Sequence, residues 1–170
     1  MADEQVGVPS GWTDKELAAL GRIVFNFAGL NWCAERLLAG FMPGEETALM
    51  ALVPIPTSEK LKKLRDMAET YLDPASPELE NLLAWADGVK LLNDERNAMV
   101  HSAWKKGPRH GVMTRIWPRV IKGQWEGKSM EVDIEVLDEV ADLIEEASKD
   151  AVQISVALAS CEGWRGRPFA

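Results

Sequence analysis

The chain has 170 residues and a formal net charge of −8 at pH 7. This length suits one domain with a hydrophobic core, and we expect residues 1–170 to form a single domain. The acidic balance argues against a protein that coats nucleic acid through an overall basic excess, but it leaves room for a local basic site. Two cysteines, and the lack of a basic leader or a long apolar run, indicate a cytoplasmic protein with free thiols and no membrane contact.

The first expected helix follows an acidic tail that we expect to be loose over residues 1–12. Thr13 and Glu16 have the spacing of a capping box, in which each side chain bonds the backbone N–H of the other residue. Apolar residues at helical spacing continue to about residue 41. The predicted buried stripe is made of Leu17, Leu20, Val24, Phe27, Ala28, Leu38 and Met42. Asn31 and Glu35 interrupt this stripe near its centre, which predicts that both face inward.

Two more helices are expected before residue 77. The first is short and covers residues 45–53, and the second starts at Ser58. The predicted buried side of the second is Leu61, Leu64, Ala68 and Tyr71. Its predicted basic outer face, which we interpret as a solvated surface, is Lys60, Lys62, Lys63 and Arg65. Ser76 and Pro77 then have the pattern of a helix cap followed by a proline at the first helical position.

The helix expected over residues 77–101 carries polar residues on its apolar side. At about 100° per residue, Asn93, Arg96 and Asn97 fall within roughly 60° of the centre of its apolar stripe. A buried guanidinium is costly unless it is paired or kept for an anion. The simplest pairing predicts an ion pair between Arg96 and Glu35 across the bundle. The alternatives are that the first helix ends before Glu35, or that this carboxylate reaches solvent at an end of the bundle.

Between residues 102 and 134 the helical spacing gives way to β-branched and aromatic residues, which predicts a small antiparallel sheet or β-hairpin. From Lys105 to Lys128 there are seven basic residues against one acidic residue. Cations that hold phosphates and flat rings that stack on bases are what a single-stranded RNA groove needs. The candidate RNA-binding residues are Trp104, Lys105, Lys106, Arg109, His110, Arg115 and Arg119. The alternative is an ordinary hairpin with solvated cations and with tryptophans that cover the bundle.

The last helix is expected over residues 135–160, where apolar residues recur at alternating spacings of three and four. Residues 161–170 contain two glycines and a proline and should be irregular. The predicted fold is therefore mostly α. It is an up-and-down helical bundle with a small β-hairpin or antiparallel sheet inserted before the last helix.

Metal and cofactor chemistry finds little support in the sequence. The two histidines, His101 and His110, have no partners at the usual zinc spacings, and the Glu-x-x-His pairs of a di-iron bundle are missing. No glycine-rich phosphate loop follows an expected strand. We therefore expect neither a metal nor a cofactor.

Arg96, the Asn97 that follows it, and His101 five residues after the arginine resemble the Arg-x4-His motif of the HEPN superfamily. HEPN domains are small helical bundles, and many are metal-independent endoribonucleases of toxin–antitoxin and anti-phage systems. The resemblance implies that Arg96 binds a phosphate, that Asn97 is the polar residue beside it, and that His101 is the acid/base of RNA cleavage by 2′-OH attack. We take as supporting residues Asn31, Glu35, Asn93 and Ser102.

The resemblance also implies a homodimer, in which two motif helices lie side by side and one cleft holds two Arg/His pairs. RNA is then the substrate, and an antitoxin protein is a further partner. Some HEPN toxins carry a modifiable tyrosine two residues after the histidine, but here that residue is Ala103, so this form of control is not implied. The alternative from another class is a non-catalytic helical interaction or scaffold module, with Arg96 and Glu35 as a structural ion pair.

Overall fold

The computed structural model describes residues 11–121 and 124–169. The tail predicted at residues 1–12 thus lies almost wholly outside the described residues. The described part has five helices and three strands, which are α1 (Asp14–Ala39), α2 (Glu45–Leu52), α3 (Thr57–Tyr71), α4 (Pro77–Val100), β1 (Ala103–Lys106), β2 (Val112–Ile121), β3 (Gln124–Asp133) and α5 (Ile134–Leu158). The prediction of a mostly helical bundle with a small antiparallel sheet before the last helix is confirmed.

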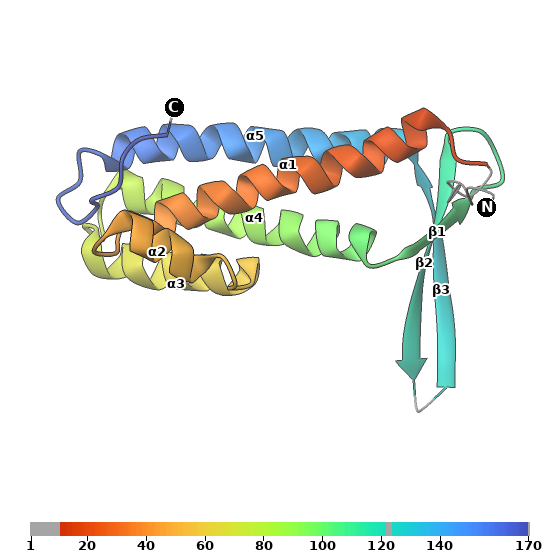
Figure 1. Ribbon diagram of the computed structural model, residues 1–170, viewed down its shortest axis with the longest axis horizontal. Helices are drawn as coiled ribbons and strands as arrows, with labels where there is room; N and C mark the ends of the chain where they lie inside the picture. The colour runs from red at the N-terminus through yellow and green to blue at the C-terminus, as the bar shows by residue number, and fades with distance from the viewer. Residues whose placement is uncertain (1–10, 122–123, 170) are drawn as a thin grey trace, which may run out of the picture.

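The three long helices α1, α4 and α5 lie side by side and form the body of the molecule (Figure 1). α1 and α5 run in the same direction, and α4 runs against both (Figure 1). α2 and α3 pack at the end where α1 finishes, so that α3 covers only the N-terminal half of α4. The sheet stands at the other end, and its β2–β3 hairpin projects away from the helix axes (Figure 1).

α1 begins at the capping box that the sequence predicts. The Glu16 backbone N–H donates to Thr13 Oγ1 at 3.2 Å, and the Thr13 backbone N–H donates to Glu16 Oε2 at 2.7 Å. The helix ends at Ala39, two residues before the expected position. At the next residue, Gly40, a Cβ atom would collide with the Trp164 indole, so glycine is what allows the tryptophan to close over the helix end.

α1 is apolar on two sides, and only one of them is buried. Ile23, Phe27 and Leu30 face the bundle, whereas Leu17 and Val24 of the predicted stripe are 40% and 45% exposed. By length and composition α1 is also the one helix in the described part that could span a membrane. Its inner side, however, belongs to the core that it shares with α4 and α5.

α3 buries Leu61, Leu64 and Ala68 as predicted, but two predictions for this helix are wrong. Tyr71 is 52% exposed because the helix ends there and the chain turns away. Lys60, which was expected on the basic outer face, is only 2% exposed.

α4 begins with Ser76 as its cap, whose Oγ accepts from the Leu79 backbone N–H at 3.2 Å, and Pro77 occupies the first helical position. The helix ends at Val100, and His101 is its C-cap residue. The sheet follows at once in the order β1-β2-β3, with both pairs antiparallel.

α5 packs along the whole of α1, and Arg22 of α1 bridges to Asp138 of α5 at 2.8 Å. The residues after Leu158 form no helix or strand up to residue 169, as predicted. Trp164 and Phe169 in this segment are nevertheless buried, so the irregular tail is part of the fold.

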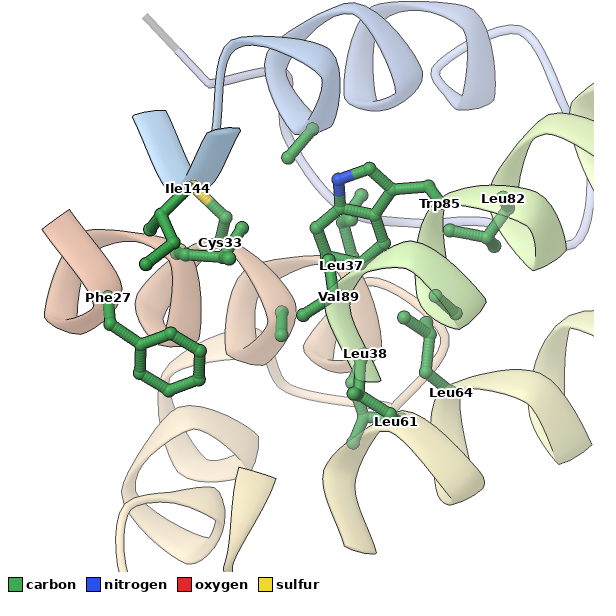
Figure 2. Close-up of a cluster of buried hydrophobic side chains, with 14 of the residues drawn as sticks. Phe27, Cys33, Leu37, Leu38, Leu61, Leu64, Leu82, Trp85, Val89 and Ile144 are labelled. Carbon is green, nitrogen blue, oxygen red and sulfur yellow. The ribbon is translucent and has the colours of Figure 1, made fainter. Parts of the chain in front are cut away.

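The core fills the space where α1, α3, α4 and α5 meet. Leu38 of α1 faces Leu61 of α3, and Trp85 and Val89 of α4 lie beside Leu37 (Figure 2). All five side chains are at most 7% exposed. This packing fixes how far α4 can slide along α1, and therefore where the polar residues near the end of α4 are placed.

Candidate functional site

Arg96 projects from α4 toward α1 and is half-buried. Its guanidinium lies over the Phe27 ring, with Cζ 5.3 Å from the ring centroid, and Nη1 donates to Asn97 Oδ1 at 2.9 Å. The Arg96 Nε is buried and has no hydrogen-bond partner. No carboxylate of the described residues lies within 4.0 Å of this guanidinium. The side chain therefore keeps donor capacity that an anion could use.

Glu35 pairs with Lys60, so the expected ion pair between Glu35 and Arg96 is wrong. Lys60 Nζ lies 2.5 Å from Glu35 Oε1, and both residues are buried. Asn31 joins the pair, because its Nδ2 donates to Glu35 Oε1 at 2.8 Å and its Oδ1 accepts from Lys60 Nζ at 3.2 Å. Thr57 Oγ1 donates to the same Asn31 oxygen at 2.8 Å. The inward orientation predicted for Glu35 is confirmed, but its partner comes from α3.

Arg96 and Lys60 lie beside different parts of α1, which explains why Glu35 pairs with Lys60 and not with Arg96. Arg96 rests on Phe27, which precedes Glu35 by eight residues, or about 12 Å along a helix. Lys60 lies beside Glu35 because α3 packs against the C-terminal half of α1. The sequence did hold a signal for this, since Lys60 stands four residues before the buried Leu64 and so shares its side of the helix.

Asn93 and Asn97 stand one turn before Arg96 and directly after it on α4. Asn93 is 6% exposed. Asn97 is half-buried and holds the guanidinium through its side-chain oxygen. The inward-facing group of three polar residues that the sequence predicts on α4 is therefore present.

His101 caps the C-terminal end of α4 and is exposed. Its backbone N–H donates to the Asn97 carbonyl at 3.0 Å, and its φ of −93° and ψ of 9° take the chain out of the helix. In a continuous helix Arg96 and His101 would lie about 140° apart. The end of α4 at Val100 removes that constraint. Ser102 Oγ donates to a backbone carbonyl one turn earlier at 2.5 Å and fixes this bend.

β1 starts two residues after His101 and is tied to the end of α4. Trp104 Nε1 donates to the Met99 carbonyl at 2.8 Å, which holds the strand against the helix. Lys105 and Lys106 on the same strand are exposed. Two exposed lysines therefore lie within a few residues of the imidazole, and the charge of Lys106 also acts on Glu16 of α1.

Arg115 and Trp117 form a cation–π pair on β2. Arg115 Cζ lies 4.4 Å from the centre of the Trp117 ring, and the Arg115 Nε is buried without a hydrogen-bond partner. The register places Arg115 opposite Trp104 of β1. The side chain of Arg119, also predicted to bind RNA, lies outside the described residues.

Arg109 and His110 are not brought to the same place as His101. The four residues of β1 separate them from it, a distance of about 13 Å in an extended strand. They border a hollow of about 450 Å³ beside the start of α1, and Arg109 pairs with Asp133 at 3.4 Å. A cleft that needs two imidazoles therefore cannot draw both from this pair of histidines.

Another hollow, of about 610 Å³, lies between α4 and α5. Its lining combines apolar side chains, among them Trp85, Val89 and Leu158, with the acidic groups of Glu78 and Asp150. None of the predicted site residues lines it. Apolar and acidic walls do not suit a phosphate, and no sequence motif indicates this hollow.

The groups available near the end of α4 are a guanidinium, two amides, an imidazole and exposed lysines. Among the described residues, no three His, Cys, Asp or Glu side chains are grouped so that they could hold a metal ion. Cys33 and Cys161 are free thiols, and burial raises the pKa of the Cys33 thiol, which makes it a poor nucleophile. This set can bind an anion and move a proton.

No protein-family model matches the chain, and no curated protein or solved structure is similar to it at a significant level. The resemblance to HEPN domains thus rests on Arg96, Asn97 and His101.

Proposed function

We propose that the protein is a metal-independent endoribonuclease of the HEPN type, in which Arg96 holds the scissile phosphate and His101 transfers the proton. The observation that carries this proposal is the state of Arg96. It is a half-buried cation with a buried, unpartnered Nε and no acidic partner among the described residues. Such an arrangement is costly unless an anion completes it.

The chemistry needs no metal, because RNA carries its own nucleophile. A base takes the proton of the 2′-OH, the oxygen attacks the adjacent phosphorus, and the 5′-oxygen leaves with a proton from an acid. A guanidinium over the phosphate stabilises the charge that develops in the transition state. His101 is exposed at the C-terminal end of α4, and an imidazole can serve as acid or base in such a reaction.

A second protomer supplies the second imidazole. One cleft with two Arg/His pairs would provide both the base and the acid, which one chain with His110 in a distant loop does not. The exposed Lys105 and Lys106 and the Arg115–Trp117 pair are suited to the flanking phosphates and to a base. A role in stress or phage defence, with an antitoxin as partner, is part of the same proposal and follows from the resemblance.

The rival function is a non-catalytic helical interaction module. The expected structural ion pair between Arg96 and Glu35 is not part of this function, because Glu35 pairs with Lys60. The observation that favours it is the exposed apolar side of α1, which includes Phe25 at 79% and Trp32 at 48% exposure. A binding module has a use for such a surface.

Cleavage of a mixed RNA pool in the presence of EDTA tests the proposal. We expect wild type to cut RNA to fragments with 2′,3′-cyclic phosphate ends, and His101→Ala and Arg96→Ala to lose at least about 100-fold in rate. Lys62→Ala is the matched control, because it removes an exposed cation on α3, away from the end of α4, and should cleave like wild type. Equal activity in wild type and His101→Ala, or none in both, refutes the proposal and favours the interaction module.

A further inference from the structure

The outer side of α1 carries an apolar surface that no other part of the described chain covers. It consists of Leu17, Gly21, Val24, Phe25, Ala28 and Trp32, which we call the α1 outer face. At 100° per residue these six positions fall within about 100° of one another. Charged residues are missing from this face between its first and last members, and Arg22 at its edge is paired with Asp138.

We infer that the α1 outer face binds the same face of a second copy of this chain, with the two helices antiparallel. The proposed function requires a homodimer, and the expectation that this chain dimerises rests on that proposed function. The surface itself is argued from α1 alone. A two-fold contact of this kind must be self-complementary, which means that each residue of the α1 outer face meets a suitable residue of the same face on the second copy.

The order of residues along α1 meets this condition when the two-fold axis passes between Val24 and Phe25. Each Gly21 then lies opposite Ala28 of the second copy, each Leu17 opposite its Trp32, and each Val24 opposite its Phe25. A Cβ atom at Gly21 would have nothing within 4 Å, so this position is open to a close approach of another helix. Small residues thus face small ones and bulky residues face bulky ones, with the two Phe25 rings beside the centre.

The ends of the face are complementary in charge. Asp14 lies at the N-terminal end of the outer side, and Arg36, which also pairs with Glu45 at 3.2 Å, lies at the C-terminal end; each is about eleven residues from the two-fold axis. An antiparallel contact therefore places each Asp14 near Arg36 of the second copy. It also places the positive N-terminal end of each helix beside the negative C-terminal end of the other.

Trp32 is fixed in position before any partner arrives. Its ring packs on Phe169, with centroids 5.9 Å apart, and Arg36 lies over it at 5.1 Å, yet 48% of the residue remains exposed. An aromatic side chain that is rigid and half-exposed loses little entropy when it is buried in an interface. Trp32 and Phe25 are therefore the anchors.

The size of the face fits a modest dimer. Phe25 and Trp32 alone expose on the order of 250 Å², if an aromatic side chain offers about 150–250 Å² in full. With the smaller residues the face amounts to several hundred Å² on each copy, so a two-fold contact removes on the order of 1,000 Å². This lies just below the range of about 1,200–2,000 Å² for stable interfaces. We expect a dissociation constant in the micromolar range.

Sedimentation velocity from about 1 to 200 µM tests the inference, with wild type, Phe25→Glu and Met50→Glu compared. We expect wild type to dimerise and Phe25→Glu to weaken association at least about 100-fold, because an anchor is lost from both copies. Met50 on α2 is 76% exposed, so Met50→Glu adds the same charge at a similar exposure away from the face and should dimerise like wild type. Circular dichroism confirms that the variants are folded.

Cross-linking tests the antiparallel register. A mixture of Gly21→Cys and Ala28→Cys chains should be joined by a short bis-maleimide, whereas Gly21→Cys alone should be joined far less, since its two copies lie about 10 Å apart along the helices. A wild type that stays monomeric at 200 µM, or a Phe25→Glu variant that dimerises normally, overturns the inference. So does a monomeric wild type that binds lipid vesicles through Phe25, which assigns the face to a membrane surface. A dimer that does not cleave RNA leaves this inference standing and counts against the proposed function.

Discussion

Replacing Glu35 with leucine is expected to destabilise the protein strongly. The substitution leaves the Lys60 ammonium 2% exposed, with Asn31 Oδ1 at 3.2 Å as its remaining acceptor. Removing one partner of a buried ion pair costs about 3–5 kcal/mol. The total stability of a domain is only about 5–15 kcal/mol, and each kcal/mol shifts the melting temperature by about 2–4 °C at this chain length. We therefore expect Glu35→Leu to lower Tm by about 6–20 °C.

Urea unfolding, followed by tryptophan fluorescence and circular dichroism, measures the effect in a double-mutant cycle. Glu35→Leu and Lys60→Met should each be destabilising, whereas the double variant, which replaces both charges with apolar side chains, should come within about 1 kcal/mol of wild type or exceed it. Glu145→Leu is the control, because its partner Lys149 is exposed and the change should hardly alter the free energy of unfolding. A cost below about 1 kcal/mol for Glu35→Leu, or a double variant no better than the weaker single one, would refute the reasoning.

Two further predictions concern the ends of α1. Gly40→Ala should destabilise the protein by about 1–3 kcal/mol because the new Cβ collides with the Trp164 indole, whereas Gly88→Ala, in open space on α4, should stabilise it by about 0.5–1 kcal/mol. Scanning calorimetry distinguishes the two, and equal shifts would contradict the packing argument. The hydrogen bond from the Thr13 backbone N–H lowers the pKa of Glu16 below its ordinary value of 4.5. The ionised Glu16 carboxylate therefore stabilises the fold at pH values above 4.5, and this contribution is lost as the pH falls through the lower pKa of the folded state. Glu16→Gln should for this reason flatten the fall in the urea midpoint on acidification. An unchanged fall would show that the carboxylate contributes nothing to stability.

Helix positions could be predicted from sequence because caps and stop signals are local. Thr13, Ser76 and Pro77 each act within one turn of the residue that bears them, and α1 and α4 begin where these residues place them. The change from helical spacing to β-branched and aromatic residues after His101 likewise located the sheet.

The side of a helix that is buried could not always be predicted, since periodicity says only that a side is apolar. α1 has two such sides, and the predicted stripe mixed them: Phe27 and Leu38 are buried, whereas Leu17 and Val24 are exposed. Which side enters the core depends on where α4 and α5 lie, and that is set by contacts far away in sequence.

The partner of a buried charge is equally non-local. The sequence placed Arg96 and Glu35 on inward-facing sides, which is correct for both. Their axial offset of about two turns depends on how α4 and α1 are aligned. Lys60 was misjudged because a lysine among other lysines is read as surface, although its spacing from Leu64 put it on the buried side.

The packing of α1 against α5 also bears on how the protein folds as it is made. α1 shares more of its contacts with α5 than with any other element, and Arg22 and Asp138, which join the two helices, are 116 residues apart in the chain. A ribosome therefore completes α1 long before the helix that covers it has emerged. During that interval α2, α3 and α4 can bury part of the inner side of α1, but the part that α5 covers stays bare. Folding of this bundle is for that reason a late event in synthesis, and the nascent chain has to be kept from aggregating until α5 leaves the exit tunnel.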